Sequence, residues 1–148
     1  MTRHRSPALN EDGSTLLLTI FYGFLALSLV LVALSATSLY LEHKRLLSLA
    51  DGAALAGSEA FTLDTVQVGV VGPRPQLRSI DVSAAVGEYL RLVPHASFEA
   101  LTVTSAASAD GQSASVTLRS WWRPPVLTLV VPDGVPLMVT VVSRAVFH

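Results

Sequence analysis

A long run without charge constrains this chain more than any other feature of its sequence. Residues 14–41 read STLLLTIFYGFLALSLVLVALSATSLYL and contain no charged residue, no proline and a single glycine. As an α-helix, at about 1.5 Å per residue, this run is about 42 Å long, and the hydrocarbon core of a bilayer is about 30 Å thick. About 20 apolar residues suffice to cross that core. The run therefore predicts a transmembrane helix over residues 14–41.

Two other interpretations of this run are weaker. The segment ALSATS, residues 33–38, has the small residues of a signal-cleavage site. However, the apolar run is much longer than the roughly 7–15 apolar residues of a secretory signal. A buried helix of a soluble protein would need a larger domain around it. The composition agrees with a membrane protein: 14% of the residues are charged, against about a quarter in soluble domains.

The sequence lacks the usual signs of catalysis and of ion or nucleic-acid binding. The net charge is −1 and no basic stripe is present, so nucleic-acid binding is not expected. There is no cysteine, and the four histidines lie far apart without metal-ligand spacing. No nucleophile elbow, phosphate loop or zinc-protease motif occurs. We therefore expect no catalytic residue, no metal and no cofactor, and we do not expect an enzyme.

Beyond the apolar run, residues 42–61 are expected to continue the helix with one apolar face. That face comprises Leu46, Leu47, Ala50, Ala53, Ala54, Gly57, Ala60 and Phe61, at spacings of three and four. The opposite, polar side is expected to hold Lys44, Ser48, Asp51, Gly52, Ser58 and Glu59. Most of its members are small, which predicts close packing against a sheet or neighbouring helices through Ala50, Ala53, Ala54, Gly57 and Ala60. The alternative, that alanine is simply a good helix former, leaves Gly52 and Gly57 unexplained, because glycine disfavours helices.

Residues 62–148 are expected to form a small domain. Residues 62–78 are a connector rich in glycine and proline, in which VQVGVV has the pattern of a short strand. The segment SIDVSAAVGEYLRLVP predicts a second helix that Ser79 or Asp81 caps and that Pro94 ends. Its apolar stripe is Val82, Val86, Tyr89, Leu90 and Val93.

Three alternating segments follow the second helix: residues 98–105, 113–122 and 136–147. Between the first two, residues 109–111 read ADG, which is a hairpin-turn signal. The residues expected to share faces are Leu101 with Val103, Val116 with Leu118, and Val139 with Val141. Together with the helices, these segments predict an α+β fold with about three antiparallel strands.

An apolar loop separates the last two strands. Residues 121–136 read WWRPPVLTLVVPDGVP, and proline bounds the apolar part on both sides. This loop either closes over the core or contacts the membrane or a partner, and both interpretations remain open. The candidate contact residues are Trp121, Trp122, Val126, Leu127, Leu129 and Val130.

Most of the chain resembles a known family, and its first 60 residues carry most of the specificity of that resemblance. The segment EDGSTLLL begins the apolar run, and the segment LEHKRLLSLA after the run contains charged residues. The segment DGAALAGSEAF comes next. This order resembles the TadE/TadG-like proteins of tight-adherence (Flp-type) pili. The resemblance implies a pilin-like fold and a pseudopilin-like, assembling component of a Tad pilus or type II-like secretion system. It also implies membrane lipid and other Tad subunits, among them TadE/TadG-like homologues, as partners.

The same resemblance implies the location of the chain. Residues 1–13 would be a cytoplasmic tail, and the C-terminal domain would lie outside a bacterial plasma membrane or within the pilus. Arg3 and Arg5 on one flank and Lys44 and Arg45 on the other do not decide the orientation by charge. The runner-up interpretation is a single-pass envelope protein, unrelated to pili, whose exported domain binds a partner.

A cleavage site is also implied, with one departure. Some members are cut by a prepilin peptidase after a glycine, and they carry a glutamate at the fifth mature position. Here the matching bond joins Gly13 and Ser14, and the matching position is Leu18. The missing glutamate weakens the expectation of processing and of entry into a filament.

Overall fold

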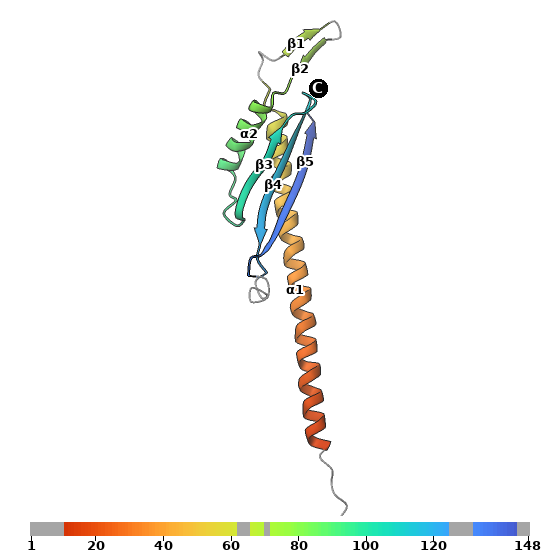
Figure 1. Cartoon of the computed structure of the whole chain (residues 1–148). Helices are drawn as coiled ribbons and strands as arrows, with labels where there is room; N and C mark the ends of the chain where they lie inside the picture. The colour runs from red at the N-terminus through yellow and green to blue at the C-terminus, as the bar shows by residue number, and fades with distance from the viewer. Residues whose placement is uncertain (1–10, 62–65, 70–71, 125–131, 145–148) are drawn as a thin grey trace, which may run out of the picture.

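The structure, a computed structural model, describes residues 11–61, 66–69, 72–124 and 132–144. Its elements along the chain are α1 (Glu11–Ser58), β1 (Val66–Gly69), β2 (Gly72–Pro75), α2 (Ser79–Leu92), β3 (Glu99–Ala107), β4 (Ser113–Trp122) and β5 (Val135–Arg144). The predicted fold class is confirmed: a long apolar helix is followed by a second helix and an antiparallel three-stranded sheet (Figure 1). We call α1 the stalk, and α2 with β3–β5 the head.

The stalk is one uninterrupted helix of 48 residues. Its N-terminal half projects away from the head, and its C-terminal half packs along it (Figure 1). Four hydroxyl groups in the apolar half bond within the helix, each donating to the carbonyl four residues earlier at 2.8–2.9 Å. These residues are Thr19, Ser28, Ser35 and Thr37. Such bonds satisfy polar groups that have no water to bind inside a bilayer.

The sheet has the order β3-β4-β5, with β4 in the centre. β4 pairs with β5 along its whole length, from Ser113 opposite Arg144 to Trp122 opposite Val135. The β3–β4 connection contains the predicted turn, in which Gly111 has a φ of +69°. This φ lies in the left-handed region, which glycine adopts without steric cost.

Asp110 stabilises that turn through its carboxylate. The carboxylate accepts hydrogen bonds from the Ser113 hydroxyl and from the backbone N–H groups of Gln112, at 2.9 Å, and Ser113, at 2.7 Å. The Ser113 hydroxyl bond, followed by the backbone bonds, lowers the pKa of Asp110 well below its usual range. Hydrogen bonds to the charged form of a carboxyl have this effect because they favour that form.

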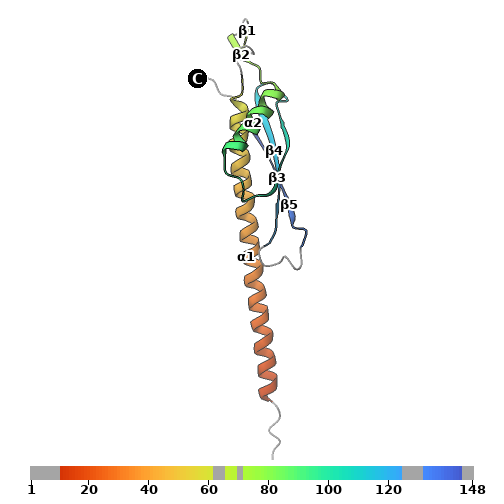
Figure 2. The same ribbon diagram turned by 90° about the vertical axis from the view of Figure 1, so that its left-hand side faces the viewer.

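Both helices cover the same face of the sheet. The stalk packs on β4 and β5, while α2 lies beside the stalk and next to β3 (Figures 1 and 2). Alternate residues of β4 point into the core, which is the two-residue period expected for a half-buried strand. The buried strand residues are Ala114, Val116, Leu118, Leu137 and Val139. The predicted inward positions of β4 and β5 agree with this arrangement.

Three local features differ from the sequence-based expectation. The N-cap of α2 is Arg78, without a side-chain cap bond, because the Ser79 hydroxyl instead exchanges hydrogen bonds with the backbone of Ser108 at 3.1 Å. Register shifts interrupt β3, so Leu101 is half-buried against the core while Val103 is 43% exposed. The connector holds two short paired strands, β1 and β2, where one was expected.

Candidate functional site: the joint between stalk and head

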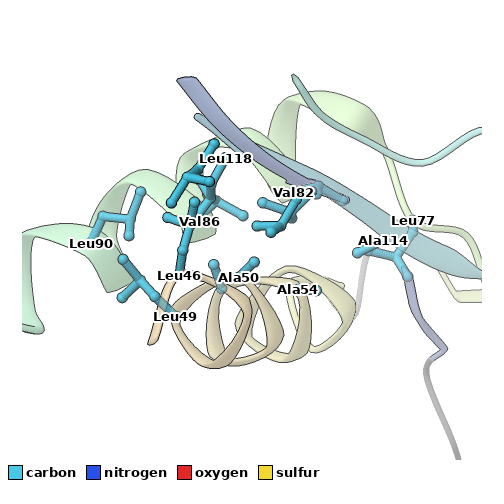
Figure 3. Packing of buried hydrophobic residues seen from close by; sticks show 14 residues of the cluster. Leu46, Leu49, Ala50, Ala54, Leu77, Val82, Val86, Leu90, Ala114 and Leu118 are labelled. Carbon is cyan, nitrogen blue, oxygen red and sulfur yellow. The ribbon is translucent and has the colours of Figure 1, made fainter. Parts of the chain in front are cut away.

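The small residues of the stalk lie where the head packs most closely. Ala50, Ala53 and Ala54 have no exposed surface. The head residues that surround them come from α2 and from β4, as Figure 3 shows: Val82, Val86, Leu90, Ala114 and Leu118. We call stalk residues 46–58, with the head residues that they contact, the joint.

Gly57 shows how tight the joint is. A β-carbon placed there would stand 3.1 Å from Val82 Cγ1 and 3.2 Å from Ala114 Cβ. Carbon atoms in favourable contact lie about 3.5–4.0 Å apart. Even an alanine at Gly57 would require these neighbours to shift by a few tenths of an ångström, so we expect larger side chains to separate the head from the stalk.

Gly52 also lies against the head, which the sequence pattern did not predict. The pattern put Gly52 on the polar side of the helix, yet the Tyr89 side chain of α2 lies over it, with Tyr89 Cζ 2.6 Å from the position of an added β-carbon. A tyrosine ring can rotate away more easily than a short core side chain. We therefore expect Gly52 to tolerate substitution better than Gly57.

The predicted packing residues lie in or near the joint. Ala50, Ala53, Ala54 and Gly57 are buried, whereas Ala60 lies beyond the end of the helix and is half-buried. The sequence reasoning missed Leu49, which is 7% exposed. Its spacings of three from Leu46 and four from Ala53 were the available signal.

Ser58 is a second residue that the sequence reasoning missed, because it was assigned to the polar side. It is 1% exposed, and its hydroxyl donates to the Leu55 carbonyl at 2.8 Å. The Ser143 hydroxyl of β5 lies 3.2 Å from Ser58 Oγ and can donate to it. This pair ties the last turn of the stalk to the edge strand of the sheet, and no local sequence pattern predicts such a contact.

The other end of the sheet contacts the stalk further down. We call residues 97–99 and 121–124 the base of the head. Trp122 Nε1 donates to Ser38 Oγ of the stalk at 3.3 Å, and Arg123 Nη2 lies 3.0 Å from Glu99 Oε1. The guanidinium of Arg119 stands over the Trp121 ring at 5.1 Å. The remaining candidate contact residues, Val126, Leu127, Leu129 and Val130, lie outside the described residues.

Two pockets open where the stalk meets the head. One, of about 300 Å³, is lined by Arg45, Ser48, Leu49, Tyr89, Val93, Pro94, Ser97 and Phe98. The other, of about 260 Å³, is lined by Ser38, Glu42, Ser97, Glu99, Trp121, Trp122 and Arg123, and we call it the base pocket. Among the described residues, no three His, Cys, Asp or Glu side chains are grouped so as to hold a metal ion.

The N-terminal half of the stalk is apolar and unburied. It is the one helix of the described chain that is long and apolar enough to cross a membrane, and none of its most apolar window is buried. Large side chains such as Leu17 and Phe24 are 71% and 70% exposed. The core helix of a soluble protein would bury such residues, so this half of the stalk is suited to lipid.

A comparison with known protein families finds a match over the part of the chain that forms the stalk. The model of the family Tad, Flp pilus-assembly TadE/G-like, matches residues 13–66, which include nearly all of the stalk. No curated protein and no solved structure matches the chain. The family match supports involvement in Flp pilus assembly, and with the apolar helix it supports membrane anchoring. The resemblance expected from the sequence is therefore confirmed over this part of the chain: residues 13–66 match the model of the Tad (Flp pilus-assembly TadE/G-like) family.

Proposed function

We propose that this chain is a membrane-anchored, pseudopilin-like component of a Flp-type (Tad) pilus or of the related type II-like secretion system. It acts by assembly and without catalysis. The observation that carries this proposal is the continuity of α1, which is a free apolar helix over one half and the core helix of the head over the other. A force on the head is therefore transmitted directly to the membrane-held half.

The orientation that we propose follows from the family. Residues 1–13 lie in the cytoplasm, and the head lies outside the bacterial plasma membrane. The chain contains no cysteine, so single cysteines can report the orientation cleanly. With a membrane-impermeant maleimide on intact cells, Gln112→Cys in the turn of the head should be labelled and Thr2→Cys should not. The reverse labelling pattern would contradict this orientation.

The partners that we propose are other Tad subunits, among them TadE/TadG-like homologues, which contact the free half of the stalk. Helices associate within a bilayer by close packing, without a hydrophobic drive between them. Phe24 is 70% exposed on this half, which projects away from the head (Figure 1). It is therefore a suitable position from which to capture a neighbouring helix.

The test combines a deletion strain with crosslinking. Deletion of the gene should abolish or strongly reduce pili, and the wild-type chain should restore them. A photoreactive amino acid at Phe24 should crosslink to another Tad subunit, whereas the same group at Ile80, which is exposed on α2, serves as the matched control on the head. Normal pili in the deletion strain would overturn the proposal and favour a single-pass envelope protein that is unrelated to pili.

A further inference from the structure

The length of the exposed, apolar half of the stalk sets the height of the head above the bilayer. From Leu16 to Leu34 the large hydrophobic side chains are exposed, apart from Leu31, which is half-buried. These 19 residues span about 28 Å as a helix, which matches the roughly 30 Å hydrocarbon core. Ser35, the next residue, is only 7% exposed. Burial of the stalk therefore begins at Ser35 on one side of the helix, while Ala36 and Thr37 remain exposed.

The base of the head begins within the next turn. Ser38 lies about 6 Å above Leu34 along the helix, and the polar layer on each side of the core is about 5–8 Å deep. Trp122 bonds to Ser38, so its indole lies in that layer. On the far side of the stalk, Lys44 Nζ stands 5.7 Å from the Tyr40 ring centroid. Aromatic and basic residues of this kind are typical of membrane interfaces.

The base pocket lies at the same height. Glu42 is one turn above Ser38, and side chains on a helix lean toward its N-terminus, here toward the bilayer. The Glu42 side chain is only 15% exposed, and its ion-pair partner among the described residues, Arg45 Nη1, is 3.9 Å away. Glu99, by contrast, has Arg123 Nη2 at 3.0 Å. The pocket therefore contains one closely paired carboxylate, Glu99, and one largely buried carboxylate, Glu42, whose ion pair is long.

The walls of the base pocket fit a cation. Trp121 and Trp122 line it together with Glu42, Glu99 and one cation, Arg123, which pairs with Glu99. The guanidinium of Arg119 already stands over the Trp121 ring, so Trp122 is the ring left for a ligand. The faces of tryptophan rings attract ammonium groups that approach within about 6 Å. A volume of about 260 Å³ is enough for a small headgroup.

We propose that the base pocket binds the ammonium end of a phospholipid headgroup of the membrane that holds the stalk. The inference rests on the proposed membrane anchoring and adds a lipid site to it. The carboxylate of Glu42 attracts the ammonium, and the indole of Trp122 borders it. A headgroup without an ammonium gains neither interaction and leaves Glu42 with its long ion pair to Arg45.

The first test measures depth. The chain has two tryptophans, so Trp121→Phe leaves Trp122 as the sole indole. In vesicles of phosphatidylethanolamine and phosphatidylglycerol, a spin label on the headgroup should quench Trp122 more strongly than a label at the end of the acyl chain. In a chain with both tryptophans replaced by Phe, Gln112→Trp, in the turn before β4 at the far end of the head, should be quenched by neither label. Quenching of Trp122 no stronger than that of the Gln112→Trp control would overturn the inference.

A second reporter separates this inference from the membrane anchoring itself. In the same tryptophan-free chain, Phe24→Trp should be quenched by the acyl-chain label. If this reporter is quenched and Trp122 is not, the lipid site is wrong and the anchoring stands. If this reporter is not quenched either, the anchoring is wrong as well.

The second test measures the headgroup preference. The full chain in detergent is titrated with dihexanoyl phosphatidylethanolamine and with the phosphatidylglycerol analogue, while tryptophan emission is recorded. The ethanolamine lipid should bind at least about tenfold more tightly, and Glu42→Gln should remove most of that preference. Glu59→Gln, at an exposed carboxylate beyond the joint, should change nothing. Equal affinity for the two lipids, or no effect of Glu42→Gln, would overturn the ammonium assignment.

Discussion

Gly57 of the stalk lies so close to Ala114 of β4 that a β-carbon on the glycine would stand 3.2 Å from Ala114 Cβ. The two residues are 57 positions apart in the sequence, and their contact fixes the distance between stalk and sheet. Because the alanine cannot retreat, the glycine sets how closely the head can dock. This contact makes the stability of the head sensitive to side-chain size at one position.

Substitution of Gly57 by leucine should destabilise the head. An oversized side chain in a packed core typically costs about 1–3 kcal/mol, and here it would also separate α1 from β4. We expect a correspondingly lower free energy of unfolding, measured by circular dichroism in detergent micelles.

The matched control for this prediction is Gly87→Ala in α2. An added β-carbon at Gly87 meets no atom within 4 Å, so the better helix propensity of alanine should raise the stability by up to about 1 kcal/mol. If Gly57→Leu were as stable as the wild type, the contact between Gly57 and Ala114 would not determine the docking.

Enlarging the two buried alanines should reduce assembly in cells. Ala53 and Ala54 have no exposed surface, so Ala53→Leu with Ala54→Leu should lower the amount of stable protein and of assembled pili. Leu55→Ala is the control, because Leu55 is 54% exposed and its truncation leaves the joint intact. Immunoblots of membrane fractions measure the protein, and electron microscopy counts the pili. Normal protein and pili in the double variant would contradict the packing role.

The stalk and the sheet were predictable from the sequence because both depend on local patterns. The uncharged run specified a membrane-length helix, and the alternation of Val116 and Leu118 specified the inward face of β4. Asp110 and Gly111 specified the turn, since the carboxylate and the left-handed φ act within a few residues. Such signals need no knowledge of which distant residues meet.

The contacts that build the joint and the base pocket depend on tertiary packing. Gly52 looked solvent-facing until α2 placed Tyr89 over it. The bond between Trp122 and Ser38 joins residues 84 positions apart. No periodicity in either segment indicates these pairs, because the docking angle of the head on the stalk decides them. The bulges in β3 also depend on tertiary packing, because they interrupt the regular pairing where the strand fits against its neighbours.

Removing the hydroxyl of Ser58 should loosen the last turn of the stalk. Ser58→Ala removes the donor to the Leu55 carbonyl and the acceptor for the Ser143 hydroxyl. A buried hydrogen bond of this kind contributes about 1 kcal/mol. A double-mutant cycle with Ser143→Ala, read by unfolding in detergent, should give a coupling of about 0.5 kcal/mol or more. Strict additivity of the two variants would show that the hydroxyl groups do not interact.

The turn at Asp110 should make the head less stable in acid. Its pKa is lowered in the folded head, chiefly by the Ser113 hydroxyl, so the carboxylate contributes stability above the unfolded pKa of about 3.9. That contribution is lost progressively as the pH falls below about 4. Asp110→Asn should therefore flatten the decline in melting temperature between pH 5 and pH 3. An equally steep decline in wild type and variant would show that this carboxylate does not drive the acid sensitivity.

The bond between Gly13 and Ser14 should remain uncut in the native host. Both residues lie in the first turns of α1, and a peptidase must extend the backbone that it cuts. Leu18 also stands where the processed relatives are expected to carry glutamate, and it is 53% exposed on the apolar helix. Mass spectrometry of the purified protein should therefore find a peptide that spans residues 13 and 14. Leu18→Glu is the informative variant, since it restores the expected glutamate. A free Ser14 at the N-terminus of the wild-type protein would show that the enzyme does not need that glutamate and that this helix unwinds at its start.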